Sequence, residues 1–348
     1  MKVGIVGFPR SGKTTVFNAL TGLQAVVGAY GDPGKPNLGA IKVPDERIDR
    51  LSAIFTPRKT TYAEVVFVDF PGAGERSGVL DPATLVQMRD ADALVQVVRG
   101  FADPITQAPA DPARDLAGFK AELVLADLAV VEKRLERLRK EKGKEQETEL
   151  LERCRAALET ETPLRRVTFA PPEERALSGF GLLSRLPLLV LINVPEDEVA
   201  APLADAVHAA LEADAVLGQV LCAQIEMEIA ALDTADRSAF LADLGLRESA
   251  RDRFVQAAYA LLDLISFLTT GEDEVRAWPI RRGTTAVKAA GKIHSDIERG
   301  FIRAEVVPYD EFIRYGSDAK CREAGKLRLE GKDYVVADGD IIHFRFNV

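Results

Sequence analysis

The residues best suited to chemistry lie near the start of the chain. The segment Gly7–Thr14, with the sequence GFPRSGKT, fits the pattern G-x-x-x-x-G-K-[ST] without a mismatch. An apolar run of strand length, Lys2–Val6, precedes it, and a helical pattern follows from Thr15. Glycines let the backbone wrap closely around a polyphosphate, and N–H groups at a helix start point toward the anion. The sequence therefore predicts a phosphate-binding loop.

Each residue type in this loop has a predicted role. Lys13 would reach the β- and γ-phosphates and act in catalysis, and the Thr14 hydroxyl would hold Mg²⁺. Asp69 ends the apolar run Val65–Asp69 and opens an Asp-x-x-Gly with Gly72. Such an Asp helps to hold Mg²⁺, and the Gly amide can sense the γ-phosphate. The predicted phosphate-side residues are Gly7, Arg10, Ser11, Gly12, Lys13, Thr14, Thr15 and Gly72, with Thr14 and Asp69 as metal ligands.

A second candidate motif follows a third apolar strand, Leu188–Asn193, where Asn193-Val194-Pro195-Glu196 stands. GTPases place Asn-Lys-x-Asp here, and its Asp accepts two hydrogen bonds from guanine. In this chain Val194 replaces the Lys and Glu196 replaces the Asp, so guanine selectivity is not secured. The motif leaves ATP and GTP both open, and an ordinary turn at a strand end is the competing interpretation.

Composition bounds the class of protein. With 348 residues, two or three domains are expected. A net charge of −9 argues against nucleic-acid binding by the whole surface, though it leaves room for a local basic patch. The three cysteines are far apart in the sequence, which favours a reducing compartment over a disulfide framework or a zinc site. No signal-peptide pattern or membrane-spanning apolar run is evident, so we expect a cytoplasmic protein without a membrane partner.

Three segments with different patterns follow one another along the chain. Strands alternate with helices at first, which predicts an α/β fold with a mainly parallel sheet. Between residues 117 and 186, apolar residues recur at 3-4-3 spacing through Leu128, Val131, Leu135 and Leu138, which predicts a helical hairpin with a coiled-coil-like seam. From about Ser266, short strands and glycine turns predict a small β-rich domain.

These residues carry a resemblance to the YchF/Obg-like ATPase family of P-loop proteins. The phosphate loop is similar to that of the family, and Asn193 with Glu196 matches its Asn-x-x-Glu base motif. The C-terminal match is the strongest and includes the runs GE, EVRAW, RRGTTA and GFIRAE between Gly271 and Glu305, followed by KLRLEGKDY. The similarity extends over nearly the whole chain and is weakest between Val27 and Met88.

The resemblance implies three parts and an activity. The parts are a nucleotidase core of residues 1–116 and 187–265, the inserted hairpin of residues 117–186, and a C-terminal β-grasp, ubiquitin-like TGS domain of residues 266–348. Family members prefer or accept ATP and associate with ribosomes. The turn beginning at Leu221 then occupies the place of the family's base-contacting turn, which makes Cys222 and Ala223 predicted wall residues of the base pocket.

The chain departs from the family at positions that matter for catalysis. Residues 29–35 contain no Thr where the family's first switch carries one, and Asp32 is either a substitute ligand or a turn residue. The second switch also differs from that of the family, and Glu75 and Arg76 are either polar candidates for orienting the attacking water or residues of a solvated loop. Arg10 stands where many relatives carry Asn, so it could supply positive charge as an arginine finger in cis, point to solvent, or pair with a switch acid.

Two functions remain open at this level. In the first, the chain is a slow Mg²⁺-dependent nucleotidase that hydrolyses the β–γ phosphoanhydride bond of ATP, or of GTP, and switches a ribosome-linked partner. In the second, it is a nucleotide-gated binding module with negligible hydrolysis. We expect a monomer that contacts a ribosome or RNA through the TGS and helical parts, and no DNA. The basic residues that could form the RNA-binding patch are Arg281, Arg282, Lys288, Lys292, Arg299 and Arg303.

Overall fold

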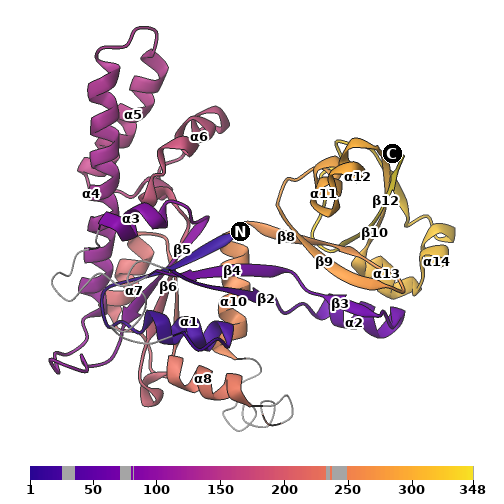
Figure 1. Ribbon diagram of the computed structural model, residues 1–348, viewed down its shortest axis with the longest axis horizontal. Coiled ribbons are helices and arrows are strands. Elements are labelled where there is room, and N and C mark those ends of the chain that lie inside the picture. The colour runs from indigo at the N-terminus through magenta and orange to yellow at the C-terminus, as the bar shows by residue number, and fades with distance from the viewer. Residues whose placement is uncertain (26–35, 71–79, 81, 233–235, 237–248, 348) are drawn as a thin grey trace. The chain divides into compact units, whose positions relative to one another are not determined.

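The computed structural model describes residues 1–25, 36–70, 80, 82–232, 236 and 249–347 (Figure 1). The described residues form two compact units. Unit 1 comprises Met1–Ile41 and Val66–Phe254, and unit 2 comprises Lys42–Val65 and Val255–Val348. None of the helices in these ranges has a stretch long and apolar enough to cross a membrane.

Unit 1 is built on a sheet whose strand order, in the described residues, is β2-β4-β1-β5-β6-β7. The pairs β1–β4, β1–β5, β5–β6 and β6–β7 are parallel, which confirms the predicted α/β fold with a mainly parallel sheet. Because parallel strands end at one edge, the loops after β1, β4, β5 and β6 are brought together there. The strands are β1 (Lys2–Val6), β2 (Asn37–Lys42), β4 (Glu64–Asp69), β5 (Ala93–Arg99), β6 (Leu188–Asn193) and β7 (Leu217–Leu221).

Helices α1 and α4 bury apolar side chains in the core of unit 1. Phe17 and Leu20 of α1 are fully buried, and Phe119 of α4 lies in a core cluster with Val6 and Leu94. The helices are α1 (Lys13–Thr21), α3 (Pro82–Met88), α4 (Pro112–Leu138), α5 (Glu145–Glu159), α6 (Pro171–Leu177), α7 (Asp205–Ala213), α8 (Ala223–Ala231) and α10 (Ala250–Leu261).

The predicted helical hairpin is confirmed as α4 and α5, which run side by side (Figure 1). The Asp111 side chain caps α4 by accepting a hydrogen bond from the Arg114 N–H, and Pro112 occupies the first turn, where its missing N–H costs nothing. The seam buries Val131 and Leu135 of α4 against Leu151 and other residues of α5. Helix α4 begins at Pro112, five residues before residue 117, where the sequence analysis placed the start of the hairpin.

Unit 2 holds a second sheet, with the order β11-β10-β12-β8-β9-β3 among the described residues. The hairpin β8–β9 is antiparallel, β12 runs parallel to β8, and β10 pairs antiparallel with β12, which is the arrangement of a β-grasp domain and agrees with the predicted fold. The elements are α2 (Glu46–Phe55), β3 (Lys59–Thr61), β8 (Leu264–Thr269), β9 (Glu274–Arg281), α11 (Ala286–Ile293), α12 (Ser295–Arg299), β10 (Phe301–Pro308), α13 (Tyr309–Tyr315), α14 (Asp318–Glu323), β11 (Arg328–Glu330) and β12 (Asp340–Phe346).

The segment Lys42–Val65 belongs to unit 2 although it lies between two strands of unit 1 in the sequence. Its strand β3 pairs in parallel with β9 and becomes an edge strand of the second sheet. The three-part division expected from the sequence stays a prediction, and it did not anticipate that this segment groups with the C-terminal part.

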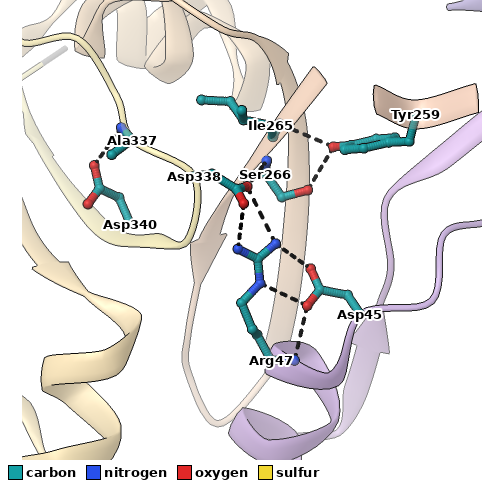
Figure 2. Close-up of polar contacts among 8 residues, drawn as sticks. All are labelled: Asp45, Arg47, Tyr259, Ile265, Ser266, Ala337, Asp338 and Asp340. Carbon is teal, nitrogen blue, oxygen red and sulfur yellow. Dashed lines mark hydrogen bonds and ion pairs between the residues drawn. The ribbon is translucent and has the colours of Figure 1, made fainter. Parts of the chain in front are cut away.

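Arg47 holds this segment in unit 2 (Figure 2). Its guanidinium donates to the Asp45 carboxylate through Nη2 at 2.8 Å and through Nε at 2.9 Å, and to Asp338 through Nη1 at 2.9 Å. Asp338 in turn accepts a hydrogen bond from the Ser266 N–H at 2.8 Å.

Tyr259 of α10 contacts the same strand, β8. Its hydroxyl donates to the Ile265 carbonyl at 3.1 Å, and burial raises the pKa of Tyr259 to about 12.

Candidate functional site

The phosphate loop lies between β1 and α1, as the sequence predicts. Gly7 and Gly12 have φ values of 142° and 89°, which side-chain-bearing residues rarely adopt. A Cβ atom at Gly7 would lie 2.3 Å from the Val97 carbonyl oxygen, and one at Gly12 would lie 2.3 Å from the Asn193 amide nitrogen. Both glycines are therefore required by backbone conformation and by space, and Gly12 is the N-cap residue of α1.

Lys13 is enclosed in this loop. Its Nζ donates a hydrogen bond to the Phe8 carbonyl at 3.0 Å, and the residue is 8% exposed. Burial lowers the pKa of Lys13 to about 8, and the negative charge of Asp69 opposes that shift. The ammonium is thus held within the loop where a polyphosphate would meet it.

The predicted metal ligands Thr14 and Asp69 lie together. The Thr14 hydroxyl donates to Asp69 Oδ2 at 2.9 Å, and the Asn37 side-chain amide donates to the same oxygen at 3.1 Å. The other carboxylate oxygen, Oδ1, is buried and has no hydrogen-bond partner among the described residues. Burial raises the pKa of Asp69, while the two hydrogen bonds and the Lys13 charge lower it. A buried carboxylate oxygen with an open coordination position beside a threonine hydroxyl is suited to a hard cation.

Asn193 connects the phosphate loop to the base side of the site. Its amide nitrogen donates to the Ser11 carbonyl at 3.2 Å, and its side-chain oxygen accepts from the Ala223 N–H at 3.1 Å. Asn193 therefore positions the loop and the start of α8 relative to each other. The Ser11 hydroxyl is buried and has no partner within the described ranges.

A cavity of about 340 Å³ opens beside these residues. It brings together six residues expected from the sequence, which are Gly12, Thr15, Asn193, Glu196, Cys222 and Ala223. Val194 and Pro195 of the base motif, and Gln224 and Ile225 of the turn that begins at Leu221, also line it, whereas sequence reasoning missed Phe101 and Glu228. Pockets of this size with one aromatic wall and a few polar groups commonly hold a small ligand.

Arg10 pairs with Asp103 in the loop after β5. The Arg10 Nε donates to Asp103 Oδ2 at 2.8 Å, and Asp103 Oδ1 accepts from the Ile105 and Thr106 N–H groups at 2.9 Å. These backbone hydrogen bonds, together with the Arg10 charge, hold the pKa of Asp103 well below its usual range. One role that the sequence left open for Arg10 was an ion pair with an acid of a switch. In the structure Arg10 does pair with an acid, but that acid is Asp103, which follows β5.

Phe101 and Asp103 are the main residues that sequence reasoning missed. Both follow directly from the fully buried strand β5, so they lie at the same edge of the sheet as the phosphate loop. That position was the signal available to find them. Gly72, Asp32, Glu75 and Arg76 lie outside the described residues.

Comparisons with known proteins agree with this architecture. A family model described as "50S ribosome-binding GTPase" matches residues 2–158, and one described as "Protein of unknown function (DUF933)" matches residues 264–347. The chain is 42% identical over 366 residues to "Ribosome-binding ATPase YchF" of Bacillus subtilis (strain 168), with 100% of each chain covered. It is 38% identical over 362 residues to the protein of the same name from Escherichia coli O157:H7, covering 100% of this chain and 99% of the relative.

A solved structure matches nearly the whole chain as well. The "Structure of the Schizosaccharomyces pombe YchF GTPase" superposes with a TM-score of 0.89 at 30% sequence identity. The match covers 99% of this chain and 97% of that chain. Sequence and fold therefore agree over both units.

Proposed function

The chain belongs to the YchF family, and from that premise we propose that it is a ribosome-associated P-loop nucleotidase that hydrolyses the β–γ phosphoanhydride bond of ATP. This proposal rests on one observation, which is that Lys13, Thr14 and Asp69 lie close together after β1 and at the end of β4. They supply a buried cation for the phosphates beside a hydroxyl and a carboxylate suited to a metal ion.

Mg²⁺ fits the residues present. Asp69 offers a buried carboxylate oxygen without a described partner, and the Thr14 hydroxyl lies against the other oxygen of the same carboxylate. Thr14 and Asp69 would hold this ion, which would supply positive charge against the charge that develops on the phosphates. Asn37 then acts as a positioning residue, because its amide fixes the orientation of the Asp69 carboxylate.

The base side favours adenine. Glu196 lies on the cavity wall in place of the shorter Asp that pairs with two guanine N–H groups, and the Lys stem of the guanine motif is replaced by Val194. Phe101 contributes an aromatic face that any purine can contact. Competition between ATP and GTP for the same site tests this choice, and a large preference for GTP would overturn it.

Single-turnover hydrolysis separates the enzyme from the binding module. We expect measurable Mg²⁺-dependent release of phosphate from ATP by the wild-type chain, and loss of at least about 100-fold in Lys13→Ala, because removing preorganised charge costs several kcal/mol. A wild-type rate no greater than that of Lys13→Ala, with ATP binding intact, would leave the nucleotide-gated binding module as the function.

The ribosome is the proposed partner, as the names of the relatives state for those proteins. Co-sedimentation of the purified chain with ribosomes, with ATP and without nucleotide, tests the association directly. Absence of co-sedimentation in both conditions would end the ribosome proposal while leaving the nucleotidase proposal intact.

A further inference from the structure

One face of the second sheet gathers three arginines around a single carboxylate. Arg303 and Glu305 are two residues apart on β10 and so lie on the same face, and Arg345 of β12 stands directly opposite Arg303. Arg322 reaches the same carboxylate from α14. Like charges in register on neighbouring strands destabilise a sheet, so the Arg303–Arg345 pairing calls for an explanation.

Glu305 cannot neutralise this cluster. Its carboxylate accepts a hydrogen bond from Arg345 Nη2 at 2.9 Å. The Nη2 atoms of Arg303 and Arg322 each lie 3.8 Å from a carboxylate oxygen of Glu305. Within the part of the chain that the structure describes, the guanidinium groups of Arg303 and Arg322 donate no hydrogen bond to a protein group, since each lies 3.8 Å from Glu305. Three guanidinium groups around one carboxylate leave two positive charges uncompensated.

The arginines are open to a partner and the carboxylate is not. The side chains of Arg303, Arg322 and Arg345 are 51%, 65% and 55% exposed, whereas that of Glu305 is 9% exposed. The hydrogen bond and charge of Arg345 lower the pKa of Glu305, so the carboxylate stays ionised at neutral pH and keeps the three arginines together. Glu305 is thus a positioning residue for a preformed cationic face.

Three other basic residues of unit 2 each have a carboxylate partner of their own. Arg282 lies 3.2 Å from Asp263, and Lys288 lies 2.7 Å from Glu298. Arg299 also forms an ion pair with an acid of its own, Asp296. These three belong to the basic group that the sequence singled out, and in the structure each is matched by one carboxylate. Of that group, Arg303 alone belongs to the cluster around Glu305.

We propose that the face formed by Arg303, Arg322 and Arg345 binds the phosphate backbone of ribosomal RNA. The inference rests on the proposed ribosome association and names the surface that makes contact. Guanidinium groups match phosphate oxygens in geometry and charge, and the face carries two uncompensated charges on a chain whose net charge is −9. The acidic remainder of the chain limits non-specific binding to RNA.

Ribosome binding measured against salt concentration tests the assignment. The variant Arg303→Gln/Arg322→Gln/Arg345→Gln should lose affinity by about tenfold or more at physiological salt. The slope of log affinity against log salt should fall by about 2–3, which is the change expected for three lost phosphate contacts. The same three positions changed to Lys should keep most of the slope. Naked ribosomal RNA should compete with ribosomes for the wild-type chain.

A matched control carries the same charge change elsewhere in unit 2. Arg282→Gln/Lys288→Gln/Arg299→Gln also removes three positive charges, but from singly compensated pairs, so its affinity and slope should stay close to wild type. Equal losses in both triple variants, or a wild-type slope in the Arg303 triple variant, would overturn the assignment. Competition by acidic ribosomal proteins instead of RNA would also overturn it. Failure of the wild-type chain to bind ribosomes would instead refute the ribosome proposal itself.

Discussion

At the scale of single residues, the site is defined by how Lys13 is buried. Its pKa of about 8 means that part of the population has lost its proton just above neutral pH in the absence of nucleotide. A polyphosphate favours the charged form, so binding must draw a proton from solvent once the pH exceeds about 8. The charge state of this lysine therefore couples nucleotide affinity to pH.

We expect nucleotide affinity to fall by up to about tenfold per pH unit above pH 8, because the neutral amine must be reprotonated on binding. Titration calorimetry in two buffers of different ionisation enthalpy measures the protons taken up. Uptake should be near zero from the lysine at pH 7 and approach one proton at pH 9. A proton count that does not change between these values would contradict the burial argument.

Arg10 raises a second question at this scale, which is whether it acts on phosphate or only holds the loop that carries Phe101. If its charge stabilises the transition state, Arg10→Ala should slow single-turnover hydrolysis by about tenfold or more, and Asp103→Asn should not slow it, because Asp103 competes for the guanidinium. If Arg10 only anchors the loop, the two substitutions should have equal effects. We expect the first pattern, together with hydrolysis that does not depend strongly on K⁺.

At the scale of elements, the sequence could predict what is local. The phosphate loop, the buried strands and the hairpin seam follow from motif spacing and from the 3.6-residue period of Val131 and Leu135, and the structure confirms them. The strand β3 could not be found in this way. It is a three-residue polar segment whose partner β9 lies more than 200 residues away, so no local pattern marks it.

The residues of the candidate site also differ in whether a local sequence pattern marks them. Residues fixed by a motif, such as Gly12 and Asn193, were predictable and do line the cavity. Phe101 and Asp103 follow a strand without a motif, and only the sheet order brings them to the loop. Contacts made by side chains from neighbouring strands depend on the tertiary fold, which the linear pattern does not contain.

Arg47 gives a testable consequence for the non-local segment. Arg47→Ala removes hydrogen bonds to two carboxylates and should cost unit 2 about 2–3 kcal/mol of its free energy of unfolding. Trp278 on β9 is the sole tryptophan in the sequence, so its fluorescence reports this unit. In the full chain, the urea midpoint of the Trp278 transition should fall by about 1 M.

The matched control for Arg47 is Arg58, which pairs with Asp273 in the same unit. Both side chains of that pair are more than 80% exposed, at 86% and 88%. Exposed ion pairs contribute less than about 1 kcal/mol, so Arg58→Ala should leave the midpoint nearly unchanged. Similar shifts in the two variants would show that Arg47 contributes no more than a surface charge.

At the scale of the whole molecule, chain connectivity links the stabilities of the two units. The segment Lys42–Val65 folds with unit 2, yet it leaves and re-enters the sheet of unit 1 through β2 and β4. While unit 1 is folded, the ends of the segment are held, which lowers the entropy that it loses on joining unit 2. The strand β4 also carries Asp69, so the same strand serves the nucleotide site.

Nucleotide bound to unit 1 should therefore stabilise unit 2 as well. At 100 times its dissociation constant, a ligand stabilises the state that binds it by about 2.7 kcal/mol. Unit 1 then stays folded to a higher temperature and keeps the ends of Lys42–Val65 held, so the thermal midpoint reported by Trp278 should rise by several degrees with ATP and Mg²⁺. The rise should vanish in Lys13→Ala at the same ATP concentration. A Trp278 midpoint that ignores nucleotide, while nucleotide protects unit 1 from unfolding, would mean that the two units unfold independently despite their shared segment.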